Sequence, residues 1–201
     1  MSSEEKKIDN AIRLIAKLSI DKSSQAFSKM IKAGARIEME KAYMADISEA
    51  TAASYAEDAE VVGAFIDLTG DAPFKFLFYV TDKDSLVLTD LILRREVGTT
   101  TEFDLYAQSA VQEVGNILSS AISNVFSADF QIALKPTPPT VLHDFAGTIF
   151  QEYLVDIAAE RNEVLIIESQ FKIIQADIKC SMFLLPYPGS EKVLNYISKA
   201  I

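Results

Sequence analysis

A carboxylate and a carboxamide, Glu113 and Asn116, stand three residues apart near the centre of the chain. In a helix this spacing puts both side chains on one face, about one turn apart. The ionised carboxylate only accepts hydrogen bonds, whereas the carboxamide both donates and accepts them. Such a pair is suited to orienting a water molecule for hydrolysis. Taken alone, the same pair is also typical of an ordinary solvated helix face.

The residues around this pair predict the helix that must carry it. Between residues 107 and 126, apolar side chains recur at helical spacing, at Ala107, Ala110, Val111, Val114, Ile117, Leu118, Ala121, Ile122 and Val125. We therefore expect a buried stripe along this helix. Ser109 and Ser120 fall on the polar side together with Glu113 and Asn116.

Periodicity and turn residues predict the remaining elements. One or two helices are expected within residues 7–31, and further helices at 84–95 and 144–159, with Ser190 capping a last helix that ends at residue 201. Strands are expected at residues 36–44, 60–68, 74–80, 130–134, 164–168 and 171–185. The second and third of these strands form a hairpin around a turn at residues 69–73, and residues 135–139 form a proline-fixed extended segment. Residues 48–59 are expected to be a poor helix or a connector.

The order of elements is repeated along the chain. A shift of 99 residues superposes the apolar positions of residues 8–15 on those of residues 107–114, and a shift of 105 superposes residues 78–80 on 183–185. We interpret this as a tandem duplication. The predicted fold is α+β, a single domain over residues 1–201 with pseudo-symmetric repeats at about 8–97 and 105–201 and helices packed on an extended sheet.

Composition excludes several classes of function. The chain has 201 residues, 49% of them hydrophobic, and a formal net charge of −10. The acidic balance, without basic stripes, disfavours nucleic acids and anionic membrane surfaces. No signal peptide and no apolar run of about 18 residues is visible, so we expect a cytoplasmic protein without a membrane segment.

The single histidine and the single cysteine give weak signals. His143 either pairs with the adjacent Asp144 or marks a helix start, and the pattern favours the helix start. Cys180 excludes an internal disulfide, and its place in a predicted strand favours a structural thiol. No group of histidines and cysteines suggests a metal site.

The polar face has a wider pattern, Ser109-x3-Glu113-x2-Asn116-x22-Pro139. This pattern resembles the motif of the CheC/CheX/FliY family of chemotaxis phosphatases, an Asp or Ser followed at the same spacings by Glu, Asn and Pro. The run of residues 112–118 and the repeat architecture are most similar to CheC. The resemblance extends over nearly the whole chain.

Only the second motif is intact. Many CheC proteins carry one motif in each half, but the first-half positions here are Asn10, Leu14, Lys17 and Glu40. Leu14 accepts no hydrogen bond and Lys17 reverses the local polarity. The resemblance therefore implies one active site.

The resemblance implies a protein phosphatase that hydrolyses the aspartyl phosphate of a CheY-like response regulator in chemotaxis signalling. It implies Glu113 and Asn116 as catalytic residues, and Ser109, Ser120 and Pro139 as partner-binding residues. No cofactor is expected on this chain, because the required Mg²⁺ would belong to the phosphorylated regulator. The alternative is a non-catalytic or weakly catalytic binding module that regulates CheD or docks to the motor switch, and the lost first motif favours it.

Overall fold

The computed structural model describes residues 3–32, 35–46, 58–149, 163–173, 176–187 and 190. Its helices are α1 (Ser3–Ile31), α3 (Asp82–Leu93) and α4 (Leu105–Phe130). Its strands are β1 (Ala35–Asp46), β2 (Glu60–Gly70), β3 (Phe74–Thr81), β4 (Leu134–Pro136), β5 (Thr140–Phe145), β6 (Glu163–Ile173) and β7 (Ala176–Pro186). The predicted α+β class is confirmed.

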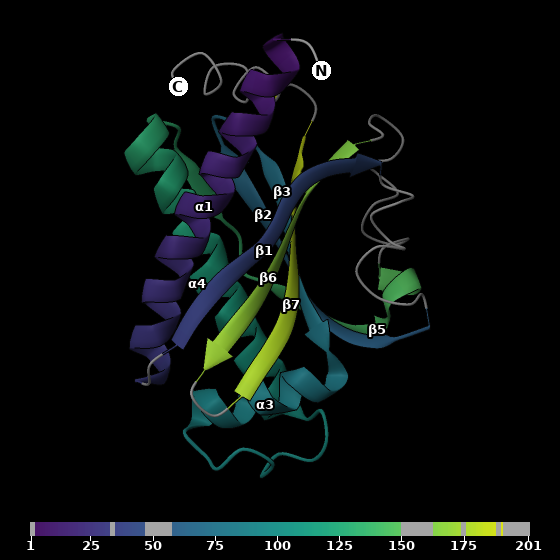
Figure 1. Cartoon of the computed structure of the whole chain (residues 1–201). Coiled ribbons are helices and arrows are strands. Elements are labelled where there is room, and N and C mark those ends of the chain that lie inside the picture. Colours follow the sequence, from purple (N-terminus) through teal and green to yellow (C-terminus); the bar gives the residue numbers. More distant parts are fainter. Residues whose placement is uncertain are drawn as a thin grey trace.

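The described strands form one antiparallel sheet, shown in Figure 1. The strand order is β1-β6-β7-β3-β2-β4, and β5 also pairs with β2. The outer strand β1, from the first predicted repeat, therefore pairs with β6 from the second. Conversely, β5 from the second predicted repeat pairs with β2 from the first. The two predicted repeats therefore share one sheet, and the duplication itself stays a prediction.

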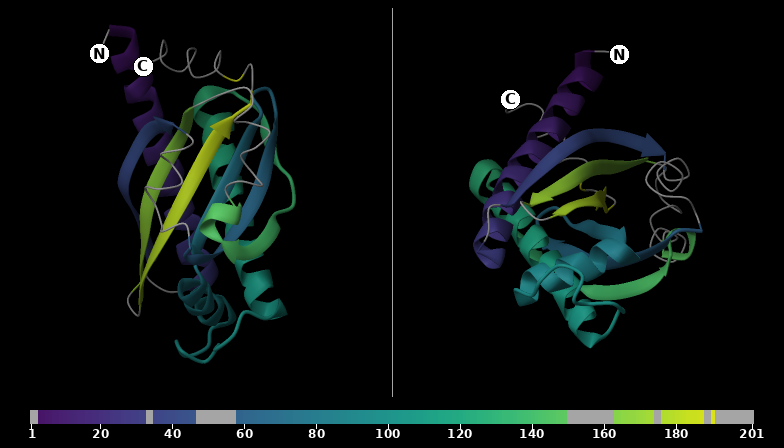
Figure 2. Two further views of the ribbon diagram at one scale, coloured as in Figure 1. Left: turned by 90° about the vertical axis from the view of Figure 1, so that its right-hand side faces the viewer. Right: turned by 60° about the horizontal axis from the view of Figure 1, so that its bottom comes forward.

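Both faces of the central strands are buried. Along β3, Phe74, Phe76 and Phe78 belong to the main core, and Leu77 and Tyr79 belong to a smaller cluster on the other face. The alternation follows from the two-residue period of a strand. Helices α1, α3 and α4 supply the other half of the main core, and Figure 2 shows α1 and α4 on the same side of the sheet.

Helix α4 confirms the predicted amphipathic stripe. Its buried apolar residues include Ala107, Ala110, Val111, Val114, Leu118, Ala121, Ile122 and Val125. The helix begins after Asp104, whose carboxylate accepts hydrogen bonds from the backbone nitrogens of Tyr106 and Ala107, both at 2.9 Å. It ends at Gln131, which has a left-handed conformation with φ of 58°.

Three predicted segments are wrong in their boundaries. The strand expected at residues 130–134 begins only at Leu134, because α4 continues to Phe130. The boundary between the last two strands is expected after residue 168, but it lies between Ile173, where β6 ends, and Ala176, where β7 begins. The helix expected from residue 144 is preceded by β5, and the described part of that segment has only a helical turn at residues 146–149.

The missed strand β5 has a clear physical cause. The edge of β2 carries backbone groups that need partners, and β5 supplies them through pairs from Glu60–Phe145 to Phe65–Thr140. Tertiary pairing therefore overrides the weak local pattern. Residues 48–57 of the segment predicted at 48–59, and the last helix after Ser190, lie outside the described residues. None of the described helices is both long enough and apolar enough to cross a membrane.

Candidate functional site

Helix α4 presents the four predicted polar residues on one exposed face. Ser109, Glu113, Asn116 and Ser120 are all exposed, and the side chains opposite them are in the core. The Ser109 hydroxyl donates a hydrogen bond of 2.8 Å to the carbonyl of Leu105, so its oxygen still faces solvent as an acceptor. The structure thus brings these four residues together in one row.

Gly115 fixes how closely this row lies over the sheet. A Cβ at this position would lie 2.9 Å from Cβ of Ala64 and 3.3 Å from Cδ1 of Ile66, both on β2. Only a residue without a side chain allows this approach. The backbone beneath Glu113 and Asn116 is therefore seated directly on a buried strand, which holds both side chains in place.

The segment that carries Pro139 is anchored to the same strand. The backbone nitrogen of Thr137 donates to the carbonyl of Asp67 at 2.9 Å, and the backbone nitrogen of Asp67 donates to Oγ1 of Thr137 at 3.1 Å. Between the pairs Leu68–Pro136 and Phe65–Thr140, two residues of β2 face three residues of this segment. The additional residue makes a bulge that carries the prolines out of the pairing register.

Pro139 packs against the motif helix. The Nε2 atom of Gln112 donates a hydrogen bond of 3.0 Å to the Pro139 carbonyl, and Cβ of Pro139 would lie 3.5 Å from a Cβ on Gly115. Pro139 is itself buried. The structure therefore joins Pro139 to the motif helix as a buried residue next to Gln112 and Gly115, whereas the four polar residues are exposed. Gln112 makes this connection. The sequence does not indicate it, because an exposed helical Gln carries no signal of a tertiary contact.

A groove runs between α4 and α1. It has a volume of about 380 Å³ and is lined by Lys22, Ala26, Glu113, Asn116, Ile117, Ser120, Ala121 and Asn124. Lys22 is the basic residue in this lining, and it comes from the half of the chain that lacks the motif. Only the packing of α1 against α4 reveals its position, so no pattern in the sequence could have indicated it. A positive charge therefore borders the face that carries Glu113 and Asn116.

The first-half positions form no matching site. Asn10 and Lys17 are exposed on α1, and Glu40 is exposed on β1. Leu14 is half-buried and packs against the main core. Its side chain is thus part of the packing between α1 and the rest of the molecule.

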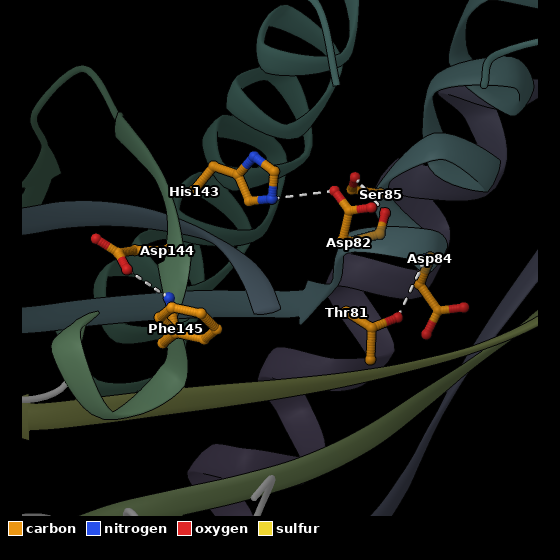
Figure 3. Close-up of polar contacts among 7 residues, drawn as sticks. All are labelled: Thr81, Asp82, Asp84, Ser85, His143, Asp144 and Phe145. Atoms are coloured by element: carbon orange, nitrogen blue, oxygen red, sulfur yellow. Dashed lines mark hydrogen bonds and ion pairs between the residues drawn. The ribbon is translucent and has the colours of Figure 1, made fainter. Parts of the chain in front are cut away.

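His143 lies in β5, and the prediction of a helix-start position is wrong (Figure 3). Its Nε2 lies 3.1 Å from Oδ1 of Asp82, the first residue of α3, and its ring lies 4.7 Å from that of Phe103. The carboxylate of Asp144 instead accepts from the backbone nitrogen of Phe145 at 2.6 Å. The His143–Asp82 contact joins β5, the strand that follows Pro139, to α3.

Cys180 is a buried thiol in the main core, and burial raises its pKa well above the ordinary value. A thiol that stays protonated is a poor nucleophile, which agrees with a structural role. Among the described residues, no group of three or more histidine, cysteine, aspartate or glutamate side chains could hold a metal ion.

The stretch that contains this site matches a known family. A model of the CheC-like family matches residues 107–143, which begin in α4 and end in β5. The chain is 21% identical over 192 residues to the CheY-P phosphatase CheC of Bacillus subtilis (strain 168), covering 90% of both chains.

Solved structures share the fold. FliY of Thermotoga maritima superposes with a TM-score of 0.80 at 15% identity, covering 100% of this chain and 99% of its own. CheX in the CheX–CheY–BeF3–Mg complex of Borrelia burgdorferi gives 0.56 at 14% identity, with coverage of 85% and 96%. The FliG–FliM complex of H. pylori gives 0.70 at 12% identity, with coverage of 96% and 99%.

The molecule thus has the fold of these FliY, CheX and FliM structures. The family match, the curated relative and the structural neighbours together support the assignment of this chain to the CheC/CheX/FliY family.

Proposed function

We propose that the chain is a protein phosphatase that hydrolyses the aspartyl phosphate of a CheY-like response regulator. One observation carries the proposal: α4 presents Glu113 and Asn116 together on an exposed face, and Gln112 of the same helix donates a hydrogen bond to the Pro139 carbonyl. This is also the stretch that the CheC-like family model matches. The curated relative is a CheY-P phosphatase, and one structural neighbour is a complex with CheY.

The chemistry requires little from this chain except position. A water oxygen attacks phosphorus, the bond from phosphorus to the aspartyl oxygen breaks, and the products are inorganic phosphate and a free carboxylate. Asn116 accepts a hydrogen bond from the water and donates one to a phosphoryl oxygen. Glu113 accepts from a lysine of the regulator or from the water. The Mg²⁺ that neutralises the phosphoryl charge belongs to the regulator.

The remaining predicted residues support this arrangement. Ser109 and Ser120 flank the catalytic pair along the exposed face and are proposed as contacts with the regulator. Pro139 is predicted as a partner contact, and because it is buried against α4 we propose that it acts by positioning the helix. Gly115 and Pro139 determine how closely α4 packs against β2 and against the proline segment. They therefore affect the reaction only through the positions of Asn116 and Glu113.

A second candidate function is docking without catalysis. The absent first motif and the likeness to FliM in complex with FliG favour a protein that binds the motor switch. Binding of CheD stays a prediction. The two functions differ in whether the chain accelerates loss of phosphate from a regulator.

The test follows phosphate release from a phosphorylated CheY-like regulator with Mg²⁺ and increasing amounts of the chain. Acceleration is expected, and its absence with the cognate regulator would reject the phosphatase in favour of docking. Asn116→Ala should lower turnover on the order of 10²-fold or more, because it removes the group that positions the water. Glu113→Ala should lose both turnover and affinity for the regulator.

Stability controls separate chemistry from folding. Both side chains are exposed, so each variant should keep its unfolding free energy within about 0.5 kcal/mol. Gln108→Ala is a matched control, since Gln108 is an exposed carboxamide on the same helix but off the motif face. A folded Asn116→Ala protein with wild-type turnover would show that the mechanism is wrong.

A further inference from the structure

The first turn of α4 exposes two large apolar side chains. Leu105 is 78% exposed and Tyr106 is 60% exposed, more than any other large hydrophobic side chain among the described residues. Single exposed apolar residues are ordinary on protein surfaces. Two consecutive ones at the start of the motif helix are not needed for its packing and indicate a contact surface.

Helix geometry places both residues in line with the catalytic pair. Tyr106 precedes Glu113 by about two turns, roughly 10 Å along the helix, and lies within about 20° of it around the axis. Leu105 precedes Asn116 by about three turns and also lies within about 20° of it. The apolar pair is therefore a continuation of the motif face.

The surroundings hold the Tyr106 ring in a fixed arrangement. The guanidinium of Arg95 lies 5.7 Å from the centroid of the Tyr106 ring, a cation–π contact. Arg95 is held in turn through its backbone nitrogen, which donates to the carbonyl of Asp90 at 2.7 Å. The buried carboxylate of Asp90 accepts from the backbone nitrogens of Gly98, Thr99 and Thr100 at 2.8 to 3.0 Å.

The loop that supports Tyr106 is ordered before any partner binds, and this favours binding of a partner. The loop between α3 and α4 is closed by bonds to Asp90 at one end and by the Asp104 cap at the other. Little conformational entropy remains to be lost when a partner covers Tyr106, which favours affinity. Tyr and Arg are also the residue types that most often dominate binding energy at protein interfaces.

We infer that Leu105, Tyr106 and Arg95 form a second contact surface for the same phosphorylated receiver domain on which Glu113 and Asn116 act. The inference rests on the proposed function. Because the surface is continuous with the motif face, a domain seated over Asn116 extends across it. Arg95 adds a local positive charge to a chain of net charge −10, so the complementary surface is apolar and edged with carboxylates.

The surface contributes to affinity and not to the chemical step. At roughly 10 Å from Glu113, its side chains do not reach the phosphoryl group. An interaction that is equal in the ground state and the transition state lowers KM without raising kcat. Substitutions here should therefore raise KM and leave kcat unchanged, in contrast to Asn116→Ala.

The experiment measures kcat and KM of the full chain with a phosphorylated CheY-like regulator, and Kd for the beryllofluoride-activated regulator. Leu105→Ala and Tyr106→Ala should each raise KM and Kd about tenfold, with kcat within about twofold of wild type. Arg95→Glu should raise both constants further, because it places a carboxylate opposite the carboxylates of the regulator, and added salt should reduce this increase by screening the repulsion. Phe145→Ala is the matched control, because Phe145 is 47% exposed on β5 and lies outside this surface.

The outcomes separate this inference from the proposed function. If wild type is active and the Leu105→Ala/Tyr106→Ala protein keeps wild-type KM and Kd, the second surface does not exist. If wild type neither binds nor dephosphorylates the cognate regulator, the proposed function itself fails. Light scattering tests the other occupant: variants that only reduce self-association would show that a second copy of this chain covers the surface. Should either alanine variant melt early, Arg95→Glu, an exposed loop change, decides alone.

Discussion

Gln112 and Pro139 are joined by a hydrogen bond of 3.0 Å, in which the side-chain amide donates to the backbone carbonyl. The bond links the motif helix directly to the proline segment. Because Gln112 precedes Asn116 by about one turn, it places that segment beside the proposed catalytic amide. Loss of this donor should therefore affect the motif through position and not through contact with a substrate.

Gln112→Glu should lower both stability and turnover. A carboxylate cannot donate, and it would face the carbonyl oxygen that now accepts. The lost bond should cost about 0.5–1.5 kcal/mol of unfolding free energy, measured by urea titration. Turnover of a phosphorylated regulator should fall, since a displacement of about 1 Å can cost on the order of 10²-fold. Gln108→Glu makes the same charge change one turn earlier and should affect neither quantity; equal losses in both variants would assign the effect to charge.

Gly115→Ala should destabilise the protein although alanine is the better helix former. The new methyl group would lie 2.9 Å from Cβ of Ala64, which sits on a buried strand and cannot move aside. Overpacking costs about 1–3 kcal/mol, against a gain of at most about 1 kcal/mol in helix propensity. Thermal melts should show a lower Tm for this variant. Ser127→Ala, at an exposed position of α4, should leave Tm nearly unchanged, and a Gly115→Ala protein as stable as wild type would contradict the close seating of α4 on β2.

Lys22→Gln should weaken binding of a phosphorylated regulator. Lys22 lines the same groove as Glu113 and Asn116 and is exposed, so its charge acts through a partly solvated medium. A screened pair is worth about 0.2–1 kcal/mol, which corresponds to a loss of affinity of up to about fivefold. The loss should shrink as salt is added, and Lys22→Arg should restore affinity. Lys29→Gln removes an equivalent charge from α1 outside the groove; a similar loss there would show that only net charge matters.

Asp84 should make folding less favourable as pH rises. Burial near the start of α3 raises the pKa of its carboxyl above the ordinary value of 3.8. The folded state therefore binds the proton more tightly than the unfolded state does, so stability is greatest below the unfolded pKa and falls as pH rises through the folded pKa. Asp84→Asn removes this titration. The stability of wild type relative to Asp84→Asn, from urea melts between about pH 3 and pH 7, should decline with pH. A flat difference would contradict the raised pKa.

Helix α4 could be read from the sequence because its apolar spacing is strong and its burial depends on one continuous stripe. The polar row of Ser109, Glu113, Asn116 and Ser120 followed from the same spacing. Pro139 was found by its motif, but its burial was not, because that depends on a bulge against β2. Strand β5 and the position of Lys22 were missed for a related reason. Both depend on contacts between segments distant in sequence, which local patterns do not record.

The pairing of β1 with β6 also sets an order of events on the ribosome. Ala35 finds its partner in Ile173, and among the described strands β6 joins the rest of the sheet only through β7. At a synthesis rate of roughly 5–20 residues per second, β1 waits on the order of ten seconds before its neighbour is made. During that time it is an unpaired strand that other chains can join. Its charged residues, Arg36, Glu38, Glu40 and Lys41, are suited to keeping the nascent chain soluble until the last strands emerge.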